Sequence, residues 1–171
     1  MPYNQGFELH IEIIENLISK QIHYPHVVGI DISKMSIDVA VINCQSMKVS
    51  IALFSNDSDG YQKMKKWLKQ QGNDCGENIL FCMEYTGLYT RNLVKYLLKR
   101  GCKVWLESSL HIKRSIGLIR GKSDKIDAER IANFAYTHQH EAKLVKLSHP
   151  TLNQLKDLMK TRIRLQNSLH S

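Results

Sequence analysis

The sequence predicts an α/β fold built on a mixed five-stranded sheet, and three observations support this prediction. Apolar, largely β-branched residues fill three successive runs with short connections, 26–33, 36–43 and 48–54, as expected for an antiparallel meander. Two later runs, 78–84 and 103–107, alternate with helical patterns, which favours parallel strands joined by crossovers. The length of 171 residues suits one domain of this kind.

Helical spacing of apolar residues identifies the segments that flank the predicted sheet. It predicts helices from about Gly60 to Gln71, from Gly87 to Arg100 and from Ser123 to Thr137, with a shorter basic helix inside 111–122. Residues 1–25 fit either an alternating strand or, better, a helix that ends before Pro25, and they form an N-terminal extension. Another apolar stripe, from Leu152 to Leu169, reaches the last residues without a stop signal, so we expect a helix that continues in a longer protein.

Composition limits the class of protein. The four cysteines form no CxxC pair, which predicts reduced packing residues and a cytoplasmic location. No run of 18 apolar residues is present, so no membrane span is expected. Residues 1–90 carry 7 Lys/Arg against 10 Asp/Glu, whereas residues 91–171 carry 17 against 6. This division favours a polyanionic partner for the second half of the chain.

Asp31 is the first unusual residue, because it interrupts the apolar strand pattern HVVGIDISK. Alternation places Val28 and Ile30 on one face and Gly29 and Asp31 on the other. Gly29 is also expected, like Gly87, at a place of tight backbone approach. An unpaired buried carboxylate costs several kcal/mol, so Asp31 must be solvated, hydrogen-bonded or bound to a cation. Glu84 ends the fourth predicted strand, and it would lie near Asp31 if the first and fourth strands were neighbours.

Asp124 and Asp127 form a second anomaly. They continue the apolar face of their predicted helix, with Ala128, Ile131 and Ala135, so both carboxylates should point inward. Four converging carboxylates would repel one another unless they bound a divalent metal, and their hard oxygen ligands favour Mg²⁺ or Mn²⁺. Structural alternatives stay open: helix capping for the helical pair, solvation for Glu84 and a hydrogen-bond acceptor role for Asp31.

The segments VVGIDISK with SIDVAV, MEYTGLY and GKSDKIDAERIANFA resemble, in order, the N-terminal domain of the bacterial insertion-sequence transposases with a DEDD catalytic set, the group that includes Piv-type DNA invertases. The resemblance implies a RuvC-like, ribonuclease H-like domain over 26–140 and Mg²⁺-dependent DNA strand cleavage and transfer in the bacterial cytoplasm. It places the four catalytic, metal-binding acids on Asp31, Glu84, Asp124 and Asp127.

The resemblance also implies a structured guide RNA as a partner besides DNA. The candidates for backbone contacts to nucleic acid are basic residues, which can also be no more than a solvated loop: Lys113, Arg114, Arg120, Lys122 and Lys125. Residues 150–171 resemble the start of the coiled-coil linker of the family, which implies a homo-oligomer in the full protein.

Tyr85 and Ser123 depart from the residues common in the family, but neither removes a ligand. The family's nucleophilic serine belongs to a C-terminal domain, and neither Ser168 nor Ser171 matches its motif. We therefore expect the fragment to be inactive alone. Two rival interpretations are a stand-alone nuclease of the junction-resolvase type and a non-catalytic nucleic-acid-binding module.

Overall fold

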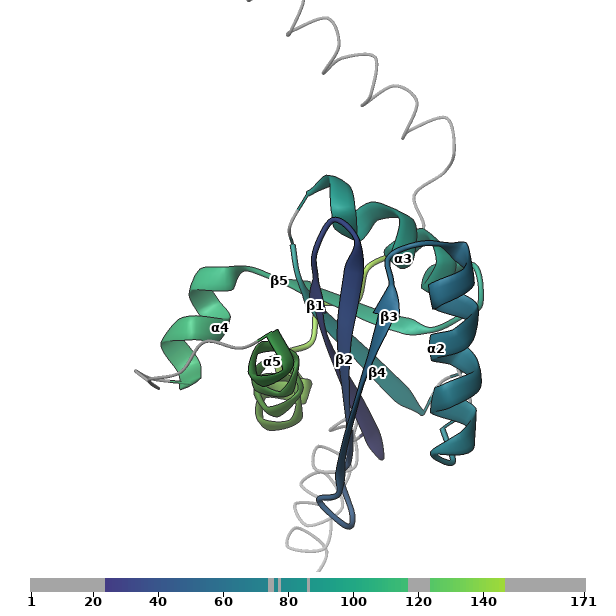
Figure 1. Ribbon diagram of the computed structural model, residues 1–171. Helices are drawn as coiled ribbons and strands as arrows, with labels where there is room; N and C mark the ends of the chain where they lie inside the picture. The colour runs from purple at the N-terminus through teal and green to yellow at the C-terminus, as the bar shows by residue number, and fades with distance from the viewer. Residues whose placement is uncertain (1–23, 74–75, 77, 86, 117–123, 147–171) are drawn as a thin grey trace, which may run out of the picture.

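The sheet has the predicted five strands, in the order β3-β2-β1-β4-β5 (Figure 1). The computed structural model describes residues 24–73, 76, 78–85, 87–116 and 124–146. The strands are β1 (His26–Ile32), β2 (Ser36–Asn43), β3 (Val49–Ser55), β4 (Ile79–Glu84) and β5 (Lys103–Glu107). β1, β2 and β3 pair as an antiparallel meander, while β4 pairs in parallel with β1 on one side and β5 on the other. This mixed sheet is consistent with a ribonuclease H-like fold.

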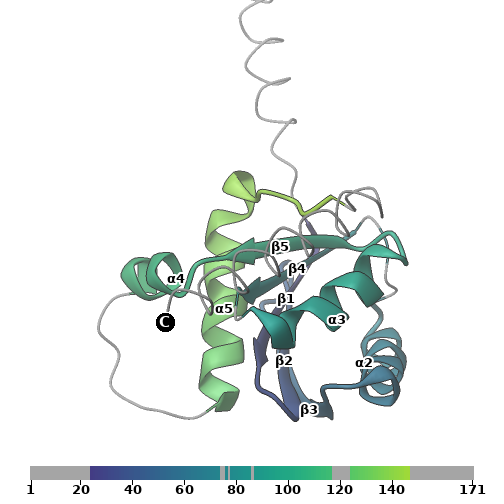
Figure 2. The ribbon, with the colours of Figure 1, turned by 90° about the horizontal axis from the view of Figure 1, so that it is seen from above.

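Helices cover both faces of the sheet, so the described part of the chain has three layers (Figures 1 and 2). α2 (Ser58–Gln70) and α3 (Leu88–Leu98) lie on one face. α5 (Asp124–His138) lies across the other, with α4 (Ser109–Ile116) beside it and a short 3-10 turn, η1 (Gln139–Glu141), after it. The predicted helices are therefore confirmed within the described ranges, and none of them there is long and apolar enough to cross a bilayer.

The core on the α2 and α3 face is formed by the apolar side of each strand. Val28 and Ile30 of β1 pack with Phe81 and Met83 of β4 and with Met64 of α2. All five side chains are fully buried. The predicted alternation along β1 is confirmed, because its even-numbered apolar residues face this layer.

The core on the α5 face is more aromatic. Trp105 of β5 lies 5.1 Å, centroid to centroid, from Phe134 of α5, and Ile131 packs beside them. Cys82 of β4 is buried in the same cluster. Cys44, Cys82 and Cys102 are free thiols, as predicted for packing residues.

Gly29 lets α5 approach the backbone of β1 directly. A Cβ atom built on Gly29 would lie 2.2 Å from the amide nitrogen of Ala132 and 2.3 Å from the carbonyl oxygen of Ala128. These are backbone atoms, so rotation of a side chain cannot relieve the clash. The prediction of a close approach at Gly29 is confirmed.

The same prediction for Gly87 is wrong. No atom of the described residues lies within 4 Å of a Cβ built on Gly87. Its φ of 77° explains the glycine instead, because side chains with a Cβ rarely adopt this left-handed conformation. Gly87 thus turns the chain between β4 and α3.

Several predictions lie outside the described residues. They are the extension over 1–23, the coiled-coil start over 150–171, and the positions of Arg120 and Lys122. The proposed boundaries of the domain also stay a prediction, although β1 begins at His26 as expected.

We predict that Gly29→Ala destabilises the fold by roughly 1–3 kcal/mol, because the added methyl group must push α5 away from β1. The measurement is the free energy of unfolding from urea denaturation. Ser50→Thr, which adds a methyl group on the edge strand β3, should change that free energy by less than about 0.5 kcal/mol. Equal stability of Gly29→Ala and wild type would contradict the observed backbone contact.

Candidate functional site

Asp31 and Glu84 lie next to each other on the α5 face of the sheet. β1 and β4 pair in parallel up to Ile30 and Met83, and the two acids follow this pair directly. Asp31 lies two residues after Gly29 and therefore faces α5, like Gly29. Adjacent strands lie roughly 4.8 Å apart, so the predicted meeting of these two carboxylates is supported by the register.

Two further acids extend this pair into a row across four strands. Asp38 of β2 is the direct partner of Asp31, and Glu107 of β5 is the direct partner of Glu84. Paired residues of neighbouring strands project to the same face, so all four carboxylates face the α5 layer. We call Asp38, Asp31, Glu84 and Glu107 the acid row. Asp38 is its most buried member, with 7% of its surface exposed.

Glu84 is held by the start of α4. Its Oε2 accepts a hydrogen bond of 2.6 Å from Oγ of Ser109, and its side chain is half-buried. The backbone carbonyl of Glu84 also accepts a hydrogen bond from Oγ1 of Thr90 in α3, at 3.4 Å. Helices on both faces of the sheet thus fix the end of β4.

Glu107 has its own partners. Its Oε1 accepts a hydrogen bond of 2.7 Å from the backbone N–H of Ser108, and its Oε2 lies 3.2 Å from Nδ1 of His111. Burial alone would raise the pKa of Glu107, but the bonds from Ser108 and His111 outweigh it and hold that pKa below its usual value. Burial, together with the carboxylates of Glu107 and Glu84, raises the pKa of the Cys82 thiol, so this thiol stays protonated.

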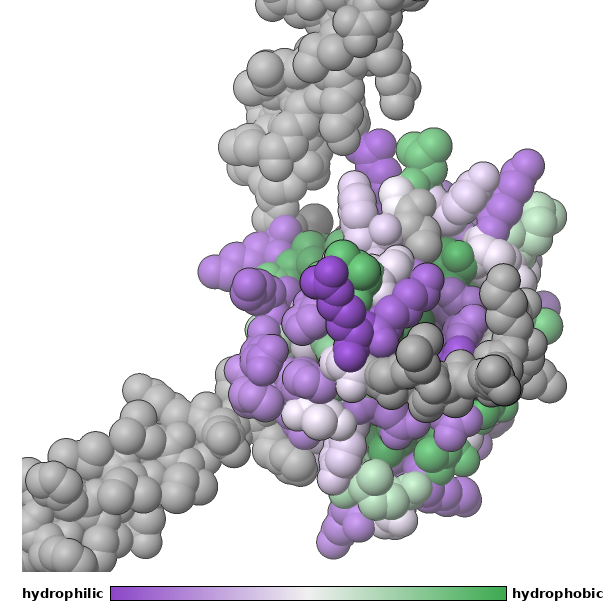
Figure 3. Space-filling view, turned by 90° about the vertical axis from the view of Figure 1, so that its left-hand side faces the viewer, coloured by the Kyte–Doolittle hydropathy of each residue, from purple (hydrophilic) through white to green (hydrophobic). Residues whose placement is uncertain are grey.

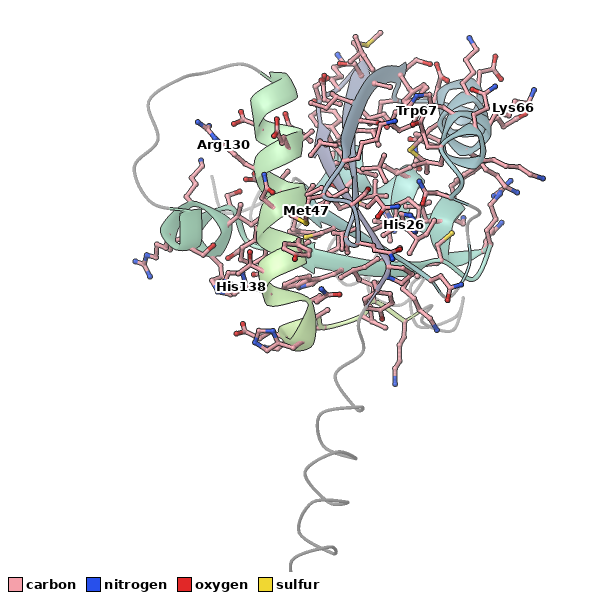
Figure 4. The ribbon with its side chains drawn as sticks, turned by 90° about the horizontal axis from the view of Figure 1, so that it is seen from below. His26, Met47, Lys66, Trp67, Arg130 and His138 are labelled. Atoms are coloured by element: carbon pink, nitrogen blue, oxygen red, sulfur yellow. The ribbon has the colours of Figure 1, made fainter. Side chains whose placement is uncertain are left out.

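Asp127 differs from its predicted inward orientation. Its side chain is 41% exposed, and its carboxylate accepts a hydrogen bond of 2.8 Å from Nη1 of Arg130. Figure 4 shows Arg130 on the side of α5 towards α4. The apolar residues expected to share its face, Ala128, Ile131 and Ala135, are buried against the sheet. Asp127 therefore lies at the rim of that face, because an arginine one turn later draws it outward.

The acids suit a hard divalent cation in chemistry, but those with described side chains do not complete a binding site. Carboxylate oxygens are the ligands that Mg²⁺ and Mn²⁺ prefer. Among the described residues, no group of three or more His, Cys, Asp or Glu side chains is arranged to hold a metal ion. Asp124 begins α5, and its side chain lies outside the described part. Completing a site would thus require Asp124 or a rearrangement of Asp127.

Two of the five predicted basic contacts can be placed. Lys113 and Arg114 are exposed in the last turn of α4. Hydrophilic residues dominate the face formed by α4 and α5 (Figure 3). The side chains of Arg120, Lys122 and Lys125 lie outside the described part.

Asp38 and Glu107 were not predicted from the sequence as members of the acid row. A signal for Asp38 was available, because an acid in the middle of the apolar run SIDVAV is as anomalous as Asp31. Its position opposite Asp31 depends on the register of β1 and β2, which the sequence did not fix. Glu107 ends a strand, where an acid is ordinary.

Glu107 should stabilise the fold only where it is ionised. Because its pKa is lower in the folded state, its contribution is present above the unfolded value and is lost as the pH falls through the folded value. We predict that Glu107→Gln lowers the free energy of unfolding by about 1 kcal/mol at pH 7. The difference from wild type should diminish in denaturation curves as the pH falls below the usual pKa of a glutamate, about 4.3. A difference that does not change with pH would contradict this role.

Comparison with known proteins assigns the chain to a family. None of the curated proteins compared with the chain matches it. The profile of the IS110-type DEDD transposases, a family described as "Transposase", matches residues 28–170. This match covers most of the chain and includes both Asp31 and Glu84. The chain therefore belongs to the family of IS110-type DEDD transposases, an enzyme family of DNA transposition.

Proposed function

We propose that this chain is the catalytic N-terminal domain of a DNA transposase or recombinase, and that Asp31, Glu84, Asp124 and Asp127 hold its divalent metal. The observation that carries the proposal is the adjacency of Asp31 and Glu84 on the face covered by α5. Family membership supplies the reaction class, which is DNA cleavage linked to transposition. The assignment of the four acids follows the family resemblance of the sequence, and the register of β1 and β4 supports it for Asp31 and Glu84.

Asp31 and Glu84 would form the fixed part of the metal site, because each stands on a strand in the centre of the sheet. Asp124 and Asp127 would join from the first turn of α5, which Gly29 holds close to β1. Asp127 must leave Arg130 to do so, so metal binding and this ion pair compete. Bound Mg²⁺ or Mn²⁺ would activate the attacking oxygen and stabilise the leaving one at a phosphodiester.

Replacing Asp31 by Asn or Glu84 by Gln should weaken Mn²⁺ binding at least tenfold, because each change removes a charged ligand without changing side-chain size. Isothermal titration calorimetry of the 171-residue chain with Mn²⁺ measures this loss. Asp59→Asn is the matched control, since Asp59 is exposed on α2, in the opposite layer. If wild type, Asp31→Asn and Glu84→Gln bound Mn²⁺ equally, the metal site would have to be abandoned.

We also propose that α4 contacts the backbone of the nucleic-acid partners, which are DNA and a structured guide RNA. A second proposal is that residues 150–171 contribute to a homo-oligomer of the full protein. Support for the first part comes from Lys113 and Arg114, exposed on the helix that also supplies Ser109 to Glu84. A cationic helix next to the acids can attract the polyanion that the acids repel. Salt-dependent binding that needs neither metal nor the acids would instead favour a non-catalytic binding module.

Neutralising both basic residues, in Lys113→Ala/Arg114→Ala, should weaken DNA binding and reduce the slope of log K against log salt by about 1 to 2, because each phosphate contact contributes about 0.9. This slope is measured by fluorescence anisotropy of labelled duplex DNA at salt concentrations from roughly 50 to 200 mM. Lys66→Ala/Lys69→Ala on α2 removes the same charge from the opposite layer, where Lys66 points away from the sheet (Figure 4). Equal slopes for the two double variants would argue against contacts by α4.

A further inference from the structure

Four large apolar side chains are exposed at the end of the sheet where Asp31 and Glu84 lie. Met35 is 75% exposed in the turn between β1 and β2. Tyr85, Leu88 and Tyr89, which follow Glu84, are 65%, 75% and 45% exposed. We call these four residues the apolar rim. Residues of this kind are ordinarily buried, so a cluster of them beside a candidate catalytic site calls for a partner.

Hydrogen bonds fix the apolar rim to the end of β1. The side-chain nitrogen of Asn56 donates to the carbonyl of Ser33, at 2.8 Å, and to the carbonyl of Tyr89, at 3.3 Å. The backbone N–H of Asn56 donates to the carbonyl of Met35, at 2.9 Å. Asn56 thus joins the turn after Asp31 to the first turn of α3.

The other tyrosine is fixed to the end of β5. The backbone N–H of Tyr85 donates to the carbonyl of Glu107, at 3.0 Å, so the pairing of β4 and β5 continues through this residue. Gly87 then turns the chain in a left-handed conformation and starts α3, which brings Tyr89 after it. Both tyrosines are therefore held by backbone hydrogen bonds and are exposed.

We propose that Tyr85 and Tyr89 stack on unpaired nucleobases of the DNA strand whose phosphate is cleaved at Asp31 and Glu84. This inference rests on the proposed function for the position of the scissile phosphate. It adds to that function a binding surface that reads no sequence and recognises single-stranded DNA.

The charge of the site favours stacking over ionic contacts at this place. The acid row repels phosphates, so the strand needs an attraction there that does not depend on positive charge. Every base offers a flat face to an aromatic ring, and such stacking tolerates any sequence. Two exposed basic residues can contact the flanking phosphates: Lys34, which precedes Met35, and Arg91, two residues after Tyr89.

Tyrosine is also the residue type expected for this partner. The tyrosine side chain is amphipathic, so it can stay in water without a partner. It has only two torsions, so it loses little entropy on stacking. Leucine would offer a comparable apolar surface to a protein but no flat ring to a base. A comparison of ring with aliphatic side chains therefore separates DNA stacking from protein docking.

The test uses the 171-residue chain and a single-stranded DNA oligonucleotide that carries one 2-aminopurine, in buffer with EDTA. Wild type should quench the 2-aminopurine fluorescence on binding. Tyr85→Leu/Tyr89→Leu should bind roughly tenfold or more weakly and lose the quenching, with an unchanged salt slope. Tyr85→Phe/Tyr89→Phe keeps both rings and should stay within about twofold of wild type.

Three outcomes would overturn the proposal: no binding of the oligonucleotide, equal quenching by the leucine and wild-type proteins, or a phenylalanine variant as weak as the leucine one. Far-UV circular dichroism and the unfolding midpoint confirm that each variant is folded. Asp31→Asn provides the separation from the proposed function, because stacking in EDTA needs no metal. Quenching by Asp31→Asn together with unaltered Mn²⁺ binding would remove the metal site and leave the stacking surface.

Discussion

The backbone contact between Gly29 and α5 is the constraint on which the rest of the site depends. It lets Ala128 and Ala132 lie directly on β1, and this contact is possible only where neither partner carries a bulky side chain. Asp31 follows two residues later on the same face, and Asp127 precedes Ala128 on the helix. One close packing contact thus sets the separation between an acid on the sheet and an acid on α5, before any metal or substrate is involved.

The acid row is tolerated because Glu84 and Glu107, its members on the two strands β4 and β5, are hydrogen-bonded to the protein itself. Ser109 holds Glu84, and Ser108 with His111 holds Glu107, so the start of α4 accounts for the β5 side of the row. Arg130 similarly holds Asp127. These bonds stabilise the negative charge and also set a cost for metal binding, because a cation must draw at least some of these oxygens away from hydrogen-bond donors. The affinity of the proposed metal site would therefore change if α4 or Arg130 bound another partner.

The sequence predicted the strands well because their apolar alternation is strong: the pattern around Asp31 placed that residue on the correct face of β1. It also identified Gly29 as a close contact. It could not place Asp38 opposite Asp31 or Glu107 opposite Glu84, because pairing depends on register and strand order, which are long-range properties. The prediction that Asp127 points inward was wrong, because helical periodicity does not account for its ion pair with Arg130, which competes with burial. The left-handed turn at Gly87 was likewise invisible to a pattern of apolar residues.

The order of the strands places three kinds of surface at the end of the sheet where β1, β4 and β5 finish. The apolar rim follows β1 and β4, in the middle of the edge, and α4 with Lys113 and Arg114 follows β5 at its end. The acids lie between these surfaces, on the α5 face. A phosphate is repelled by the acids and attracted by α4, while a base gains only from the tyrosine rings. A nucleic-acid strand would fit all three surfaces if its backbone lay against the cations of α4 and its bases reached the tyrosine rings. A divalent ion would then neutralise the acids where the phosphate passes. Under the proposed function, the same arrangement would explain why the carboxylates take up a metal and why the aromatic side chains stay exposed.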